Sequence, residues 1–148
     1  MITTGFRHVG IVVDDMELQR KFYENLLGLE CYYDQVEQGK WLHSILKCGE
    51  STYAQIVKLG KNNTAMIELL YFNEWVYRDS GNAKRFNEVG ITHMAFTVKD
   101  LEGLYRLMER EKVNFVSPPH RSPDGKVNVC FCHDYEGNLV ELVEVITS

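Results

Sequence analysis

The feature that most constrains this chain is an internal repeat. The stretch from Gly5 to Val13 has the same design as the stretch from Gly90 to Val98, which lies 85 residues further along. Both stretches alternate as half-buried strands do, and each carries a histidine at the same place, His8 in the first and His93 in the second. The sequence therefore predicts one structural motif used twice.

Each repeat continues in the same way after its first strand. An aspartate, Asp15 or Asp100, leads into a run with helical spacing of apolar residues, and three strand-like runs follow. The order strand, helix, strand, strand, strand is expected in both halves. The fold class is predicted to be α+β, with the helices and strands of each half forming one unit.

The predicted domain boundaries follow from this repeat. The first module is expected to span residues 1–72, with a helical insertion at about 40–49, where apolar residues recur at helical spacing. Residues 73–89 are expected to link the halves, and the second module to span residues 90–148. The insertion accounts for most of the extra length of the first module.

Composition excludes several classes of function. Hydrophobic residues make up 45% and charged residues 25% of the 148 residues, which is typical of a globular protein. A formal charge of -5 gives no basic surface for nucleic acid or an anionic membrane. No leader-like segment is seen, and no run reaches the roughly 18 apolar residues of a transmembrane helix, so a cytoplasmic protein is expected.

The four cysteines form no Cys-x-x-Cys pair. We interpret them as reduced thiols that serve as small apolar side chains, with a redox or metal-binding role as the alternative. The remaining histidines, His43, His120 and His133, are interpreted as ordinary surface or loop residues.

Two glutamates complete a possible site. Glu68 and Glu141 each stand among apolar residues in the last strand of their half, so each is either turned toward water or compensated by a partner. His8 and His93 also have a structural alternative, as histidines packed in the core. Corresponding positions in two related units favour a shared site, because a two-fold arrangement would bring all four residues to one cleft. Two imidazoles and two carboxylates suit a borderline divalent ion.

Five stretches carry a resemblance to a known family: Arg7 to Glu17, Phe22 to Leu29, Ile67 to Leu70, Gly90 to Val98, and Gly137 to Leu142. In these stretches the chain resembles the vicinal oxygen chelate superfamily, which groups glyoxalase I, methylmalonyl-CoA epimerase, extradiol dioxygenases and the fosfomycin and bleomycin resistance proteins. The resemblance implies two βαβββ modules that form an eight-stranded, cup-shaped mixed sheet. It also implies a homodimer and one divalent metal ion, Ni, Co, Zn, Mn or Fe, held by His8, Glu68, His93 and Glu141.

The resemblance most favours a metal-dependent isomerase or lyase of the glyoxalase or epimerase type, acting on a small carbonyl compound or thioester. Glu141 is the first choice for the base that removes a proton next to the metal-bound carbonyl, and Glu68 is the second. Val12 stands where short bacterial glyoxalase I carries an arginine for glutathione, and Glu68 stands where the epimerases usually carry glutamine. The resemblance therefore singles out no one reaction.

Two alternatives remain open. One is a small-molecule or drug-binding protein of the resistance type, which would not turn over its ligand. The other is an iron-dependent extradiol dioxygenase, against which Glu68 counts because those enzymes hold iron with two histidines and one glutamate.

Overall fold

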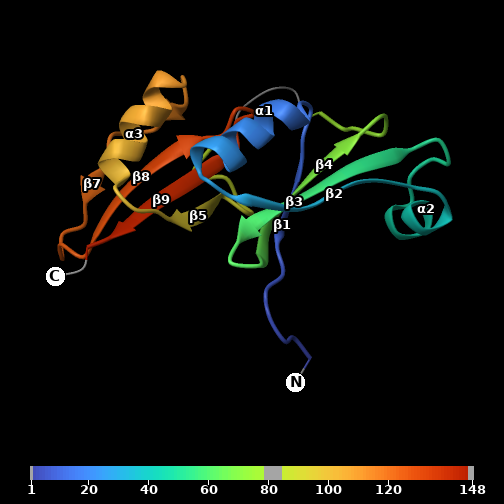
Figure 1. The fold of residues 1–148 in the computed structure, drawn as a ribbon, viewed down its shortest axis with the longest axis horizontal. Helices are drawn as coiled ribbons and strands as arrows, with labels where there is room; N and C mark the ends of the chain where they lie inside the picture. The colour runs from blue at the N-terminus through green and yellow to red at the C-terminus, as the bar shows by residue number, and fades with distance from the viewer. Residues whose placement is uncertain (1, 79–84, 147–148) are drawn as a thin grey trace. The chain divides into compact units, whose positions relative to one another are not determined.

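A computed structural model describes residues 2–78 and 85–146, and it divides the chain into two compact units, Met1–Ser80 and Gly81–Ser148 (Figure 1). The boundary falls within residues 73–89, although residues 79–84 of this expected linker lie outside the described residues. The division into modules at residues 1–72 and 90–148 stays a prediction. Each unit is described by itself below.

Unit 1 contains a four-stranded mixed sheet in the order β1-β4-β3-β2. Its elements are β1 (Val9–Val12), α1 (Met16–Arg20) with a π-helical continuation η1 (Lys21–Leu26), β2 (Glu30–Gln38), α2 (Lys40–Leu46), β3 (Tyr53–Lys61) and β4 (Thr64–Phe72). β1 runs parallel to β4, whereas the other pairs are antiparallel. This is the predicted βαβββ order, with α2 at the place of the expected helical insertion.

The helix that the sequence predicts after Asp15 is present, but its winding changes part-way along. Asp15 caps it by accepting a hydrogen bond from the Leu18 amide, as the sequence predicts. The wider π-helical turn follows, in which the consecutive residues Phe22 and Tyr23 are both fully buried. Gly28 then adopts a left-handed conformation at φ 69°, which ends the helix.

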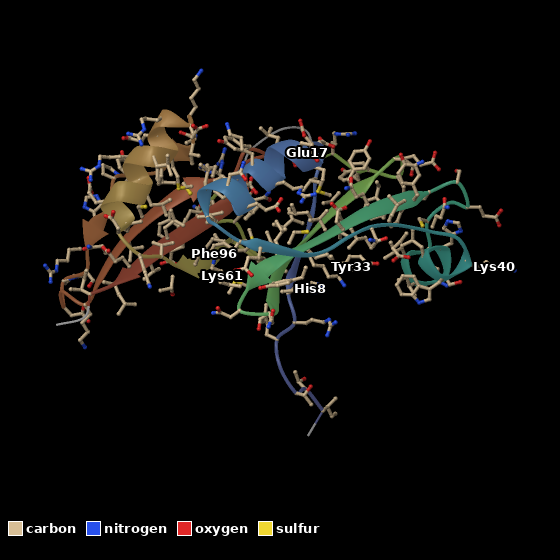
Figure 2. The ribbon with its side chains drawn as sticks, viewed as in Figure 1. His8, Glu17, Tyr33, Lys40, Lys61 and Phe96 are labelled. Atoms are coloured by element: carbon tan, nitrogen blue, oxygen red, sulfur yellow. The ribbon has the colours of Figure 1, made fainter. Side chains whose placement is uncertain are left out.

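One face of the unit 1 sheet packs against this helix and forms the core. The buried residues of that face, all in the strands except Val13, which follows β1, are Ile11, Val13, Val57, Leu59, Ile67 and Leu69. They lie at alternate positions, so the intervening residues point to the opposite face. Figure 2 shows Glu17, on α1, on one side of these strands, and His8 and Tyr33 on the other. We call the side that carries His8 the open face of unit 1.

The helix α2 covers one end of this open face. Leu42 of α2 packs with Ala54 and Phe72 in a small apolar cluster, and Leu70 contacts that cluster. Glu68 and Phe72 share a face of β4 and lie four residues apart, which is roughly 13 Å along a strand. The insertion thus closes one end of the open face and leaves the end near His8 and Glu68 uncovered by α2.

Unit 2 repeats the design with a five-stranded sheet in the order β5-β9-β8-β6, to which β7 adds by pairing with β8. Its elements are β5 (His93–Thr97), α3 (Leu101–Arg110), β6 (Asn114–Phe115), β7 (His120–Arg121), β8 (Val127–His133) and β9 (Leu139–Val145). In Figure 1, α3 lies along the β8 and β9 strands. Asp100 caps α3 through the Gly103 amide.

The α+β class and the two βαβββ units are confirmed, with one difference in the sheets. The described strands form two sheets of four and five strands, where eight strands in a single sheet were expected. The ninth strand, β7, pairs His120 with Val129 and Arg121 with Asn128. Among the described residues, no helix is long and apolar enough to span a bilayer.

No disulfide joins the four cysteines; two of them are buried as small apolar side chains are, whereas Cys31 is exposed. Cys130 and Cys132 lie on the helix-covered face of unit 2, opposite Leu142 and Val140 of β9, and are almost completely buried. Burial raises the pKa of the Cys130 thiol to about 11 and that of the Cys132 thiol to about 12. Both are therefore protonated at neutral pH, and they act as small apolar side chains.

This burial predicts a difference in thiol reactivity. At pH 8 we expect iodoacetamide to modify Cys31, which is exposed, much faster than Cys130 or Cys132, because only an accessible thiolate reacts. Mass spectrometry of the native and the urea-unfolded chain measures this difference. Equal modification of Cys31 and Cys132 in the native chain would contradict the burial of the second thiol.

Candidate metal centre

In unit 1, a histidine and a glutamate from neighbouring strands face each other. His8 immediately precedes β1, and Glu68 lies in the middle of β4, which is hydrogen-bonded to β1. His8 Nε2 lies 3.5 Å from Glu68 Oε1, and both side chains are largely but not fully buried, at 21% and 16% exposed. The parallel register pairs Gly10 with Glu68, so His8 is the diagonal neighbour of the glutamate on the same face.

Unit 2 contains the same arrangement. His93 is the first residue of β5, Glu141 lies on β9, and His93 Nε2 is 3.2 Å from Glu141 Oε2. The parallel register pairs Ala95 with Glu141, just as it pairs Gly10 with Glu68. In both units the smallest residues of the strand therefore lie beside the carboxylate, two residues after the histidine. The sequence equivalence of the four residues is thus an equivalence in register.

The Nδ1 atoms of His8 and His93 are both buried and have no hydrogen-bond partner among the described residues. Nε2 is consequently the nitrogen through which each ring meets its glutamate. Metal-ligand bonds of roughly 2.1 Å place neighbouring ligand atoms roughly 3.0–3.4 Å apart around one ion. The separations of 3.5 and 3.2 Å in the two pairs fit this spacing, so each pair has the donor types and the approximate geometry of two adjacent metal ligands.

The structure brings the four predicted residues together as two pairs, one in each unit. Within residues 2–78 and 85–146, no group of three or more histidine, cysteine or carboxylate side chains is placed to hold an ion. One ion held by His8, Glu68, His93 and Glu141 together stays a prediction.

The surroundings of the two pairs differ. In unit 1, β3 places Lys58 directly opposite Glu68, and Lys58 Nζ lies 3.4 Å from Glu68 Oε2. The two oxygens of Glu68 thus face different partners, Oε1 toward His8 and Oε2 toward Lys58. In unit 2, the equivalent position opposite Glu141 is Phe131. Among the described residues, Glu141 has no basic partner besides His93.

Aromatic rings enclose His93. Phe86 stacks on its imidazole at 5.6 Å between ring centroids, and Phe131 meets it edge-on at 5.2 Å. These contacts restrict the ring to one orientation, with Nε2 toward Glu141. The side of the imidazole covered by Phe86 is therefore shielded from water.

A tight turn fixes the start of the strand that carries Glu141. Asp134 is only 4% exposed, and its carboxylate accepts hydrogen bonds from the backbone amides of Glu136 and Asn138 and from the Asn138 side chain. Gly137 completes the turn in a left-handed conformation at φ 90°. The turn leads directly into β9 and so helps to set the register of Glu141.

A comparison of the sequence with protein-family models shows what this arrangement belongs to. Residues 5–142 match the model described as the Glyoxalase/Bleomycin resistance protein/Dioxygenase superfamily. The chain belongs to this superfamily. The matched range includes both histidines and both glutamates, and the expected relationship is confirmed.

Solved structures of the superfamily share this fold. A glyoxalase family protein from Bacillus cereus has a TM-score of 0.88 at 20% identity, covering 98% of this chain and 96% of its own. The fosfomycin resistance protein FosX from Listeria monocytogenes has a TM-score of 0.64 at 15% identity, and the match covers 98% of this chain and 96% of FosX. The trypanothione-dependent glyoxalase I of Leishmania major has a TM-score of 0.63 at 19% identity, and the match covers 96% of this chain and 87% of that enzyme. No curated protein matches the chain in sequence.

The remaining histidines take no part in either pair. His43 Nε2 lies 3.1 Å from the Thr52 carbonyl oxygen and so ties α2 to the start of β3. His120 is exposed on β7, and His133 ends β8. The exposure of His120 agrees with its interpretation as a surface residue, whereas His43 is partly buried on α2 and His133 lies on a strand with its Nδ1 atom buried.

Sequence reasoning missed Lys58 as a neighbour of the site. The sequence did contain a signal for it. Ala54, Ile56 and Lys58 alternate along one strand face, so the lysine continues a row of apolar residues. A lysine on a largely apolar face calls for a partner, and Glu68 is that partner. Only the strand register, which the sequence does not show, identifies it.

Proposed function

We propose that this chain is a divalent-metal-dependent enzyme of the glyoxalase or epimerase type, which removes a proton next to the carbonyl group of a small substrate. The observation that carries the proposal is the pair of equivalent histidine and glutamate contacts, each on a parallel strand pair and each with a small residue beside the glutamate. A repeated fold does not by itself require the same two polar residues in both units.

His8, Glu68, His93 and Glu141 would hold the ion, from one chain or from two chains of a homodimer. A bound divalent ion of this kind polarises a carbonyl group and so makes the adjacent proton more acidic. Nickel, cobalt, zinc, manganese and iron all accept imidazole and carboxylate ligands. The Nε2 atoms are the donors on the imidazole side, since both Nδ1 atoms are buried.

We assign the proton transfer to Glu141. One oxygen of Glu68 lies against His8 and the other against the Lys58 ammonium, so both oxygens already have a neighbouring polar group. Glu141 Oε2 lies against His93, whereas its second oxygen meets no cation among the described residues. That second oxygen accepts the proton and can return it to the same or a neighbouring atom, as general acid and base catalysis requires.

The test has two parts, metal content and proton exchange. We expect the chain, purified without chelator, to contain a divalent ion by elemental analysis and to lose it in the Glu68→Ala variant. In deuterated water, the unmodified chain is expected to exchange the α-proton of 2-oxoaldehyde thiol adducts or acyl thioesters. Tight ligand binding with no exchange would favour the resistance-type alternative instead, and oxygen uptake with iron retained in the variant would favour a dioxygenase.

A further inference from the structure

Unit 1 has a pocket of about 390 Å³ on its open face, at the end not covered by α2. Three basic residues, Arg7, His8 and Lys58, line it together with three aromatic residues, Phe6, Tyr32 and Tyr33. Asn63 of the turn between β3 and β4, and the first two residues of β4, complete the lining. No carboxylate side chain belongs to this lining, so the pocket combines positive charge with aromatic walls.

Lys58 occupies the junction between this pocket and the candidate metal centre. Its ammonium lies 3.4 Å from Glu68 Oε2 and 5.0 Å from the centre of the Tyr33 ring. An ammonium group has three N–H donors, and one carboxylate oxygen uses only one of them. The Tyr33 hydroxyl donates to Glu37 and is thereby turned along β2, so Tyr33 presents its ring and not its hydroxyl to Lys58.

The second repeat shows that the fold does not need this lysine. Register equivalence places Phe131 opposite Glu141, where unit 1 has Lys58 opposite Glu68. A phenylalanine therefore fills the same position in the same strand order. Arg7 adds a second cation, which has no carboxylate partner among the described residues and lines the same pocket. Lys58 keeps N–H donors beyond its contact with Glu68, and Arg7 has no carboxylate partner in the described part of the chain, so the two cations can hold an anion at this mouth together.

We propose that this pocket binds the acidic group of a small organic acid, a carboxylate or phosph(on)ate, through Lys58 and Arg7, with the planar part of the molecule against Tyr32 and Tyr33. The inference rests on the proposed function, because it defines the substrate as an acidic carbonyl compound whose charged group binds beside Glu68. Lys58 is accordingly a specificity-determining residue, and the ion pair with Glu68 fixes its position.

Anion binding can be measured separately from catalysis. We would titrate the full chain with phenylphosphonate, with benzoate and with neutral benzamide, and follow backbone amide signals by NMR, first on the chain as purified and again after chelator treatment. We expect at least one of the acids to bind about tenfold or more tightly than benzamide, as a charge-assisted hydrogen bond contributes. The affected amides should lie on β3 and in the β3–β4 turn, and binding should weaken at higher ionic strength.

Variants identify the cation responsible. Lys58→Met keeps the length of the side chain and should weaken binding of the acid about tenfold, while Lys58→Arg should largely restore it and guards against a folding defect. Lys126→Met is the matched control, because Lys126 is an exposed lysine of unit 2 that pairs with Asp124. It removes the same charge and should leave the affinity unchanged.

Three results would overturn the inference. The first is equal binding of the acids and benzamide, and the second is equal affinity of Lys58→Met and the unmodified chain. The third is binding that disappears with chelator treatment, which would assign it to a metal ion.

A chain that binds no metal but binds the acid through Lys58 would contradict the proposed function and leave this inference standing. A chain that exchanges protons with unaltered rates in Lys58→Met, and binds no acid, would contradict this inference alone.

Discussion

Glu141→Gln is expected to abolish proton exchange while leaving the fold intact. The substitution keeps the size of the side chain and removes the group that accepts the proton, so the exchange rate should fall about 10²- to 10⁴-fold. Glu141 lies on the face of β9 opposite the buried Val140 and Leu142 and pairs only with His93 among the described residues. An amide fits this position without burying a new charge. The rate should be measured at saturating metal, so that weaker metal binding does not mimic a lost base.

Two further variants decide whether the base is assigned to the correct glutamate. Glu144→Gln, three residues along the same strand, changes a carboxylate that accepts a hydrogen bond from Asn128 and should not alter the rate. Glu68→Gln removes the carboxylate that Lys58 already occupies, and should cost metal affinity more than proton transfer at saturating metal. A larger loss of exchange rate in Glu68→Gln than in Glu141→Gln would show that Glu68, and not Glu141, is the base.

The repeat made most of this fold predictable. Strand alternation places Ile11 and Val13 on the face opposite His8, and in the structure both are buried while His8 lies on the open face. Two aspartates correctly marked the starts of two helices. The match between the halves also singled out His8, Glu68, His93 and Glu141, which the structure places as two pairs. Equivalent strands have the same register in both halves, so equivalent residues have equivalent neighbours.

What the sequence did not reveal depends on pairing between strands. Lys58 meets Glu68 because of the β3–β4 hairpin, where Asn62 and Asn63 adopt left-handed conformations at φ 52° and 58°. A β carbon at Gly60 would lie 1.9 Å from the Thr64 carbonyl oxygen, so glycine is required where the register shifts. Such local constraints determine which side chains are opposite one another, and strand periodicity does not.

The extra strand β7 was missed for a related reason. Pro118, Pro119 and Pro123 surround His120 and Arg121, and prolines indicate a loop because they cannot donate to a strand ladder. The two intervening residues nevertheless pair with β8, and two residues are too few for any periodicity to reveal.

The π-helical segment was also unpredictable. Over so short a length, its spacing of buried residues resembles that of an α-helix.

Substituting either histidine is expected to remove the metal from the whole chain. If the two pairs bind one ion, His8→Ala and His93→Ala should each weaken binding of that ion. The loss should exceed the roughly 10- to 100-fold that follows when a residue hydrogen-bonded to a metal ligand, and not the ligand itself, is substituted. Metal should then be absent from both purified variants. Added nickel or zinc should raise the melting temperature of the unmodified chain, because the ion binds the folded state, but not that of either variant.

The comparison of the two variants tests whether the pairs act together. If each pair bound its own ion, substituting one histidine would empty one pair and leave the other occupied. Each variant would then keep half the metal of the unmodified chain. His120→Ala is the matched control, since His120 is exposed on β7 and belongs to neither pair. His93 also packs against Phe86 and Phe131, so the melting temperature of the metal-free His93→Ala variant must be measured as well. Complete loss from both variants, with His120→Ala unchanged, is the result that one shared ion requires.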